Sequence, residues 1–140
     1  KNRGVVTGKK SFICLDVGEK RIGVALADSA VRIAIPYTTL EVDGEEIQAI
    51  AKLFVQEDAA AIVVGYPRNQ QGEATAQTEY VVEFAEQLKE FAKVIFQDES
   101  LTSVEAERRL AKRRGGYTKG DIDAEAAAII LQDYIEEYYG

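Results

Sequence analysis

Residues 12–28 read FICLDVGEKRIGVALAD, and the start of a β-sheet is predicted from them. Its two apolar segments, 12–17 and 22–28, are rich in Ile and Val and are separated by a short polar turn that contains Gly18. A third segment of the same kind follows at 33–40. Because such short connections join neighbouring antiparallel strands, the sequence predicts three antiparallel strands at the start of the chain.

The hydrophobic pattern changes after Asp43-Gly44 to that of helices alternating with strands. Two further strands are predicted over 60–66 and 94–97, the first with the continuous apolar character of a strand buried on both faces. Four helices are predicted from apolar stripes and capping residues. The apolar stripe of the first is Ile47, Ile50, Ala51 and Phe54, and that of the second is Tyr80, Phe84, Leu88 and Phe91. The third extends from Thr102 to Gly115-Gly116, and the fourth is capped by Thr118 or Asp121, with an inner face of Ala124, Ala127, Ile130 or Leu131, Tyr134 and Tyr138. This order predicts an α/β domain with one five-stranded mixed sheet flanked by helices, its first three strands antiparallel and its last two parallel.

Length and composition limit the domain organisation and the chemistry. A chain of 140 residues, 46% of them hydrophobic, has room for one compact domain, which we expect over 11–140 after a flexible basic tail over 1–10. The absence of histidine excludes catalytic triads, Cys-His pairs and His-ligated zinc. The single cysteine, Cys14, suits a reducing compartment, so we expect a cytoplasmic protein, and no apolar run is long enough for a membrane span. Because the chain contains no methionine, we expect that it lacks its start residue.

Charge is distributed unevenly along the chain. The net charge of −7, from 17 basic and 24 acidic residues, argues against binding to nucleic acid by bulk electrostatics alone. The segment 108–119 nevertheless carries six cations and no acid: Arg108, Arg109, Lys112, Arg113, Arg114 and Lys119. This basic segment either holds a phosphate backbone or forms a solvent-exposed helix face.

Four acidic residues stand at places that favour apolar side chains or functional sites. Asp16 closes the first strand on the side that Cys14 also faces, where a carboxylate needs a partner unless it is only a turn residue. Asp98 and Glu99 come directly after the fifth strand, where sites gather in open α/β sheets, or they compensate the start of the next helix. Asp123 begins the last helix, where it either joins a site or complements the helix dipole.

Three of these acids predict a metal site if the strand ends of Asp16 and Glu99 are neighbours and the last helix brings Asp123 to the same edge. Such a cluster raises at least one carboxyl pKa unless divalent cations neutralise it. Mg²⁺ or Mn²⁺ suits an all-oxygen site, and two ions about 4 Å apart can support phosphodiester cleavage without histidine. We therefore expect these three carboxylates to be catalytic residues that hold Mg²⁺ or Mn²⁺, as a pair of ions.

Four segments of the chain, in this order, resemble motifs of the YqgF family of Holliday junction resolvase-like proteins, which are named as pre-16S ribosomal RNA nucleases. The segments are LDVGEKRIGVA at 15–25, VGYPRN at 64–69 with Gly72, DESLTS at 98–103 and DAEAAAIIL at 123–131. The resemblance extends from residue 12 to about residue 138 and implies a ribonuclease H-like fold. It also implies metal-dependent hydrolysis of nucleic acid in 5′-end maturation of pre-16S ribosomal RNA, and action on Holliday junction-like DNA.

The resemblance also assigns roles to residues. It implies Asp16, Glu99 and Asp123 as metal ligands, with Asp98 as a substitute for Glu99, and a loop around Asn69 that either lies beside the site or caps a helix. The residues expected to contact nucleic acid are Arg21, Arg68, Asn69, Arg108, Lys112, Arg113, Arg114 and Lys119. The implied partners are RNA and branched DNA and no membrane, for a monomer or a homodimer.

Two residues depart from the family pattern, and two other functions remain open. Ser100 stands where the family typically has Arg, which removes one expected phosphate contact or carboxylate partner, and Tyr66 replaces a common Leu. An actin-like or sugar-kinase-like phosphate site uses a similar strand turn, but it needs two related domains, for which 140 residues are too few. A non-catalytic RNA-binding module for ribosome assembly would use the basic segment 108–119 while the acids serve structure alone.

Overall fold

The first three strands form the predicted antiparallel meander. The computed structural model describes residues 9–67, 75–99, 102–112 and 116–140. Strand β1 (Ser11–Val17) pairs antiparallel with β2 (Arg21–Asp28), which pairs antiparallel with β3 (Ile35–Glu41).

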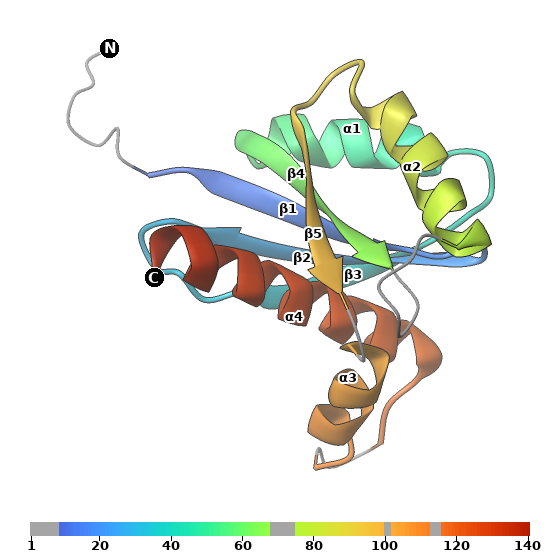
Figure 1. The fold of residues 1–140 in the computed structure, drawn as a ribbon, viewed down its shortest axis with the longest axis vertical. Helices are drawn as coiled ribbons and strands as arrows, with labels where there is room; N and C mark the ends of the chain where they lie inside the picture. Colours follow the sequence, from blue (N-terminus) through green and yellow to red (C-terminus); the bar gives the residue numbers. More distant parts are fainter. Residues whose placement is uncertain (1–8, 68–74, 100–101, 113–115) are drawn as a thin grey trace.

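The remainder of the chain alternates helices and strands as predicted. These elements are α1 (Glu46–Gln56), β4 (Ala59–Pro67), α2 (Ala76–Leu88), β5 (Val94–Glu99), α3 (Thr102–Leu110) and α4 (Lys119–Tyr139). The strand order in the sheet is β3-β2-β1-β4-β5, and β4 is parallel to both of its neighbours. The predicted five-stranded mixed sheet with flanking helices is therefore confirmed (Figure 1).

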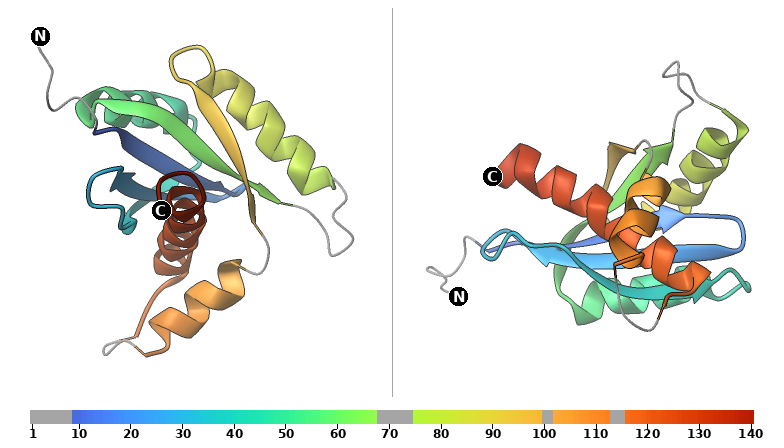
Figure 2. Two further views of the ribbon diagram at one scale, coloured as in Figure 1. Left: turned by 60° about the vertical axis from the view of Figure 1, so that its left-hand side comes forward. Right: turned by 90° about the horizontal axis from the view of Figure 1, so that it is seen from below.

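The sheet lies between two helical layers. Figures 1 and 2 show α1 and α2 on one face and α4 along the other. In β1, Ile13 and Leu15 are buried with residues of α1 and α2, whereas Phe12 and Cys14 are buried against α4. Because side chains alternate along a strand, Asp16 lies on the α4 face of β1.

The start of α4 is fixed by its cap and by a close approach to β2. Both predicted capping residues are used, since the Asp121 N–H donates to Thr118 Oγ1 (3.1 Å) and the Thr118 N–H donates to Asp121 Oδ2 (2.9 Å). A Cβ added to Gly23 in β2 would lie 1.9 Å from the Asp123 carbonyl oxygen. The glycine therefore allows the first turn of α4 to rest directly on the sheet.

Several predicted boundaries are wrong. Strand β3 begins at Ile35 rather than at residue 33, because Asp28 Oδ1 accepts from the backbone N–H groups of residues 30 and 31, and Arg32 has a positive φ of 62°. Helix α3 ends at Leu110, well before Gly115-Gly116, and the Lys112 N–H then bonds to the Arg109 carbonyl oxygen.

Two other predicted positions differ from the structure. Strand β5 extends through Glu99, because its pairing with β4 continues to the end of that strand. Tyr138 is 60% exposed instead of facing inward, because it lies in the last turn of α4, where its ring packs along the helix against Tyr134, whereas Ile135 is buried.

The remaining sequence predictions concern the tail and the membrane. Residues 1–8 of the predicted tail lie outside the described residues. Lys10 exchanges hydrogen bonds with Ser29, its N–H donating to Ser29 Oγ and its carbonyl accepting from the Ser29 N–H. In the described ranges, none of the helices is both long and apolar enough to cross a membrane.

Candidate active site

Asp16 is a carboxylate placed against the apolar layer between β1 and α4. It pairs in register with Gly23 of β2, directly beneath the first turn of α4. The pKa of Asp16 is raised to about 8, first by burial and then by the negative charges of Glu99 and Asp123, in that order of importance. The side chain is therefore mostly protonated at neutral pH when no cation is near.

Glu99 lies on the same face of the sheet as Asp16. Its strand partner is Pro67, and a Cβ added to Gly65 would lie 3.1 Å from Glu99 Oε1 and 2.8 Å from Ile130 Cδ1 of α4. The missing side chain at Gly65 thus leaves room for the Glu99 carboxylate above β4.

Asp98 points to the opposite side of the sheet. Phe96, two residues earlier in β5, packs with the α1 and α2 layer and makes an edge contact with Tyr66 at 5.4 Å between ring centroids. Strand alternation places Asp98 on the face of Phe96 and Glu99 on the face of α4. The structure therefore brings Glu99, and not Asp98, onto the face that carries Asp16.

Asp123 reaches this region from the first turns of α4, but it already has a cationic partner. Arg21 Nε donates to Asp123 Oδ2 at 2.6 Å, and the two side chains are 32% and 24% exposed. This hydrogen bond, together with the negative charge of Asp123, raises the pKa of Arg21. Sequence reasoning expected Arg21 to contact nucleic acid and missed this pair, because the partners are 102 residues apart and only the passage of α4 over β2 joins them.

The carboxylates of Asp16, Glu99 and Asp123 influence one another electrostatically, but they do not form a complete metal-binding site. Glu99 and Asp123 both raise the pKa of Asp16, and burial followed by Asp16 and Glu99 raises the pKa of the buried Cys14 thiol. Among the described residues, no three Asp, Glu, Cys or His side chains are close enough to hold one ion. The oxygen donors suit Mg²⁺ or Mn²⁺, and a cation would relieve the charge repulsion at Asp16, so the chemistry of the site fits a metal ion. The arrangement of the three carboxylates does not form a complete set of metal ligands.

The predicted basic surface is partly neutralised by ion pairs. Arg108 bonds to Glu105 at 3.0 Å, and Arg109 bonds to Glu125 at 3.2 Å. Lys112, just beyond α3, and Lys119, the first residue of α4, are exposed. The predicted contact residues Arg68, Asn69, Arg113 and Arg114, and the departure at Ser100, lie outside the described residues.

One signal in the sequence could have located the helix crossing. Gly23 stands inside an otherwise apolar strand, which is typical of a close backbone approach, and the structure shows that approach at the Asp123 carbonyl. The contact of Thr39 with α4, where its Oγ1 donates to the Gly120 carbonyl at 2.6 Å, has no comparable signal.

The sequence matches the family described as RuvX, Holliday junction resolvase, over residues 10–137. A protein of Chloroflexus aurantiacus is 42% identical over 131 residues, which cover 89% of this chain and 86% of that protein. A protein of Caldanaerobacter subterraneus is 40% identical over 129 residues, which cover 87% of this chain and 93% of that protein. Both carry the name "Putative pre-16S rRNA nuclease".

Two solved structures have a similar fold at low sequence identity. Thermus thermophilus RuvC in complex with a Holliday junction substrate matches with a TM-score of 0.55 and 15% identity, over 94% of this chain and 96% of that chain. Fowlpox virus resolvase in complex with Holliday junction DNA matches with a TM-score of 0.57 and 10% identity, over 93% and 99%. The resemblance found in the four sequence motifs is thus confirmed, and the chain belongs to the RuvX (YqgF) family of Holliday junction resolvase-like proteins.

Proposed function

We propose that this protein is a metal-dependent nuclease that hydrolyses phosphodiester bonds of nucleic acid, in 5′-end maturation of pre-16S ribosomal RNA. The relatives' name and their identity over most of both chains support this substrate. Holliday junction-like DNA is a second proposed substrate, supported by the family description and by the junctions bound to the two similar structures. The proposed place of action is the cytoplasm, where the free, buried thiol of Cys14 stays reduced.

The single observation that carries the proposal is the buried position of Asp16, whose pKa is raised first by burial and then by the negative charges of Glu99 and Asp123. A protein has little reason to bury such a group unless a cation or a reacting proton meets it. We propose Asp16 and Glu99 as ligands of Mg²⁺ or Mn²⁺, with Asp123 completing a site for two ions. Bound there, the ions would supply a nucleophilic water and stabilise the leaving oxygen.

The other residues of the site position groups and attract phosphate. Arg21 holds the Asp123 carboxylate through the 2.6 Å hydrogen bond and competes with a metal ion for it. Lys112, just after α3, and Lys119, at the start of α4, are exposed and can neutralise phosphates. Arg68, Asn69, Arg113 and Arg114 remain proposed contacts to the nucleic acid backbone. A monomer or a homodimer is compatible with this arrangement.

One observation favours a second function. Arg21 already satisfies Asp123, and the described carboxylates do not form a three-ligand set. A protein that only binds RNA during ribosome assembly would keep such an ion pair for stability and would use its cations for phosphate contacts. The two functions differ in whether Asp16 takes part in chemistry.

Cleavage of two substrates by matched variants separates these functions. An RNA fragment spanning the 5′ end of 16S ribosomal RNA and a four-way DNA junction are incubated with Mg²⁺ or Mn²⁺ and wild type, Asp16→Asn or Glu107→Gln. Glu107 is an exposed acid on α3 and serves as the control for loss of one charge. We expect Asp16→Asn to abolish cleavage and Glu107→Gln to leave it unchanged. Equal cleavage by Asp16→Asn would refute the catalytic proposal, and RNA binding without cleavage by wild type would favour the assembly function.

A further inference from the structure

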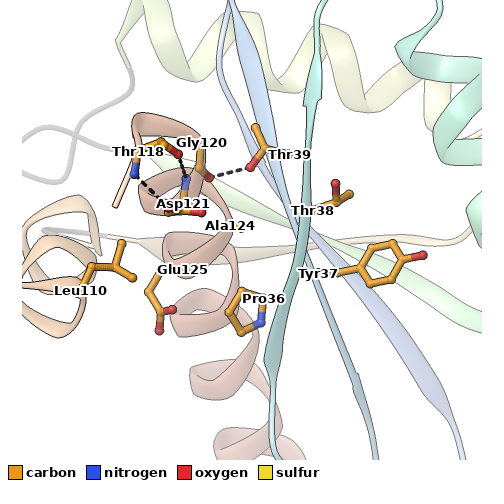
Figure 3. Close-up of a pocket in the computed structure, with 10 residues that line it drawn as sticks. All are labelled: Pro36, Tyr37, Thr38, Thr39, Leu110, Thr118, Gly120, Asp121, Ala124 and Glu125. Atoms are coloured by element: carbon orange, nitrogen blue, oxygen red, sulfur yellow. Dashed lines mark hydrogen bonds between the residues drawn. The ribbon is translucent and has the colours of Figure 1, made fainter. Parts of the chain in front are cut away.

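A cavity of about 450 Å³ opens on the flank of α4 that faces away from the carboxylates of the candidate active site. Figure 3 shows it bounded by the edge strand β3, the end of α3 and the first two turns of α4. Nothing in the proposed mechanism uses this cavity. Its volume lies within the range of about 300–1,000 Å³ that is usual for small-molecule sites, which is enough for one nucleobase.

The walls of the cavity suit the faces of a planar ring. Leu110 of α3 and Ala124 of α4 are buried apolar residues that line it, and Pro36 lines it from β3. Thr39 points from the edge strand towards α4, and its hydroxyl donates to the Gly120 carbonyl (Figure 3). Polar groups make up more of the lining than apolar ones, so the few apolar side chains would contact the faces of a ring while the polar groups orient it by hydrogen bonds.

Glu125 gives the cavity its chemical preference. Its side chain is only 16% exposed, and Arg109 Nη1 donates to Oε2 at 3.2 Å. Within the part of the chain that the structure describes, no donor reaches Oε1. Because Oε1 of this cavity-lining carboxylate can accept a further hydrogen bond, a ligand that presents an exocyclic amino group to it would bind better than one that presents a carbonyl oxygen.

The same carboxylate disfavours a phosphate in the cavity. Asp121 also lines it, with Oδ2 accepting the Thr118 N–H, so two acidic side chains border the space. A phosphate would be repelled by both, whereas an amino group on a ring would be attracted. Cations that can hold the flanking phosphates, Lys119 at the start of α4 and Lys112 after α3, lie outside the cavity lining.

We propose that this cavity binds one unpaired base of the nucleic acid substrate and prefers a base with an exocyclic amino group, adenine, cytosine or guanine, over uracil. This inference rests on the proposed function only in that it takes nucleic acid as the ligand. In α4, Asp123 is directed towards β2 while Asp121 and Glu125 line the opposite flank, so a strand that crosses the start of the helix reaches both places. A base that is already unpaired enters without the cost of being taken out of a stacked duplex.

Gly120 offers a way to fill the cavity without disturbing the fold. A Cβ added there would lie 3.6 Å from Thr39 Cβ and from Thr118 Oγ1, which is ordinary van der Waals contact. Leucine also favours a helix more than glycine does, so Gly120→Leu should fold while its side chain occupies the cavity. Glu125→Gln keeps the shape of the wall and removes the charged acceptor. Glu107→Leu places a leucine on the exposed surface of α3 and serves as the control.

The test compares binding of cytidine and uridine decamers by fluorescence anisotropy in EDTA, so that cleavage plays no part. These pyrimidines stack similarly and differ at the position where the amino group of cytosine meets an acceptor. We expect wild type and Glu107→Leu to bind the cytidine decamer roughly tenfold more tightly than the uridine decamer. Gly120→Leu and Glu125→Gln should each remove this preference by weakening the binding of the cytidine decamer.

Two results would overturn the inference. One is equal affinity of wild type for both decamers, or no binding of the cytidine decamer at all. The other is a preference for cytidine that survives in both Gly120→Leu and Glu125→Gln. Because the measurement is made without divalent ions, it succeeds or fails independently of the cleavage assay that tests the proposed nuclease.

Discussion

Without divalent cations, the stability of the folded protein should fall as the pH rises from 4 to 8, and Asp16 should be the cause. The folded state raises the pKa of this carboxyl from 3.8 to about 8, first by burial and then by the charges of Glu99 and Asp123. The folded chain therefore holds the Asp16 proton more tightly than the unfolded chain does. Raising the pH through this range favours the unfolded state, which releases the proton more easily.

The size of the effect follows from the two pKa values. Each pH unit between the two pKa values corresponds to about 1.4 kcal/mol, so the three units from pH 4 to pH 7 set an upper limit of about 4 kcal/mol on the free energy of unfolding lost. Between pH 5 and pH 8 the corresponding loss is about 3 to 4 kcal/mol. For a domain whose total stability is about 5–15 kcal/mol, this is a large fraction.

Urea unfolding in EDTA at pH 5 and at pH 8 measures this loss for wild type, Asp16→Asn and Glu107→Gln. Asp16→Asn should lose the pH dependence that Asp16 causes and should be more stable than wild type at pH 8. Glu107→Gln corrects for the general effect of removing one charge, and Asp133, whose pKa is also raised by burial, is present in all three proteins. Addition of Mg²⁺ at pH 8 should stabilise wild type more than Asp16→Asn. Asp16 is not the cause of the pH dependence if wild type and Asp16→Asn lose the same free energy of unfolding between the two pH values.

Three further predictions follow from the contacts of α4 and from the exposed cations. Gly23→Ala should lower the free energy of unfolding by about 3 kcal/mol, because the added Cβ meets the backbone of α4. Gly120→Ala should be neutral or stabilising, because the Cβ at that position makes only ordinary van der Waals contacts. Urea unfolding of both proteins checks this. Arg21→Gln should tighten Mn²⁺ binding a few-fold in calorimetry, because a partly exposed ion pair worth up to about 1 kcal/mol no longer competes for the carboxylate; weaker Mn²⁺ binding would contradict this. Changing both Lys112 and Lys119 to Gln should reduce the slope of log affinity for single-stranded RNA against log salt by about 1.4, and an unchanged slope would show that these lysines do not contact phosphates.

The local features of the fold could be predicted because they depend on neighbouring residues. Alternation in residues 12–17 places Asp16 on the side of Cys14, and the structure has both on the α4 face. The capping box at the start of α4 is likewise encoded within four residues, from Thr118 to Asp121. The ends of β3 and α3 could not be predicted, because a turn around Asp28 and the loss of helical pairing after Leu110 depend on contacts rather than on periodicity.

The candidate site could be predicted as a set of residues but not as a geometry. Strand pairing and alternation bring Asp16 and Glu99 to one face, which the positions of these acids in their strands already indicate. The pair of Arg21 with Asp123 depends on how closely α4 approaches Gly23, and no local pattern specifies that distance. The role of the three acids as metal ligands stays a prediction.

Crystals of the protein soaked with Mn²⁺ show directly, from the anomalous scattering of manganese, whether these acids hold a metal ion. We expect manganese bound by carboxylate oxygens of Asp16 and Glu99, with the Asp123 carboxylate shifted from Arg21 towards the metal. Crystals at saturating Mn²⁺ in which no manganese lies beside Asp16, or in which manganese binds only at other surface acids, would show that the three acids do not form a metal site.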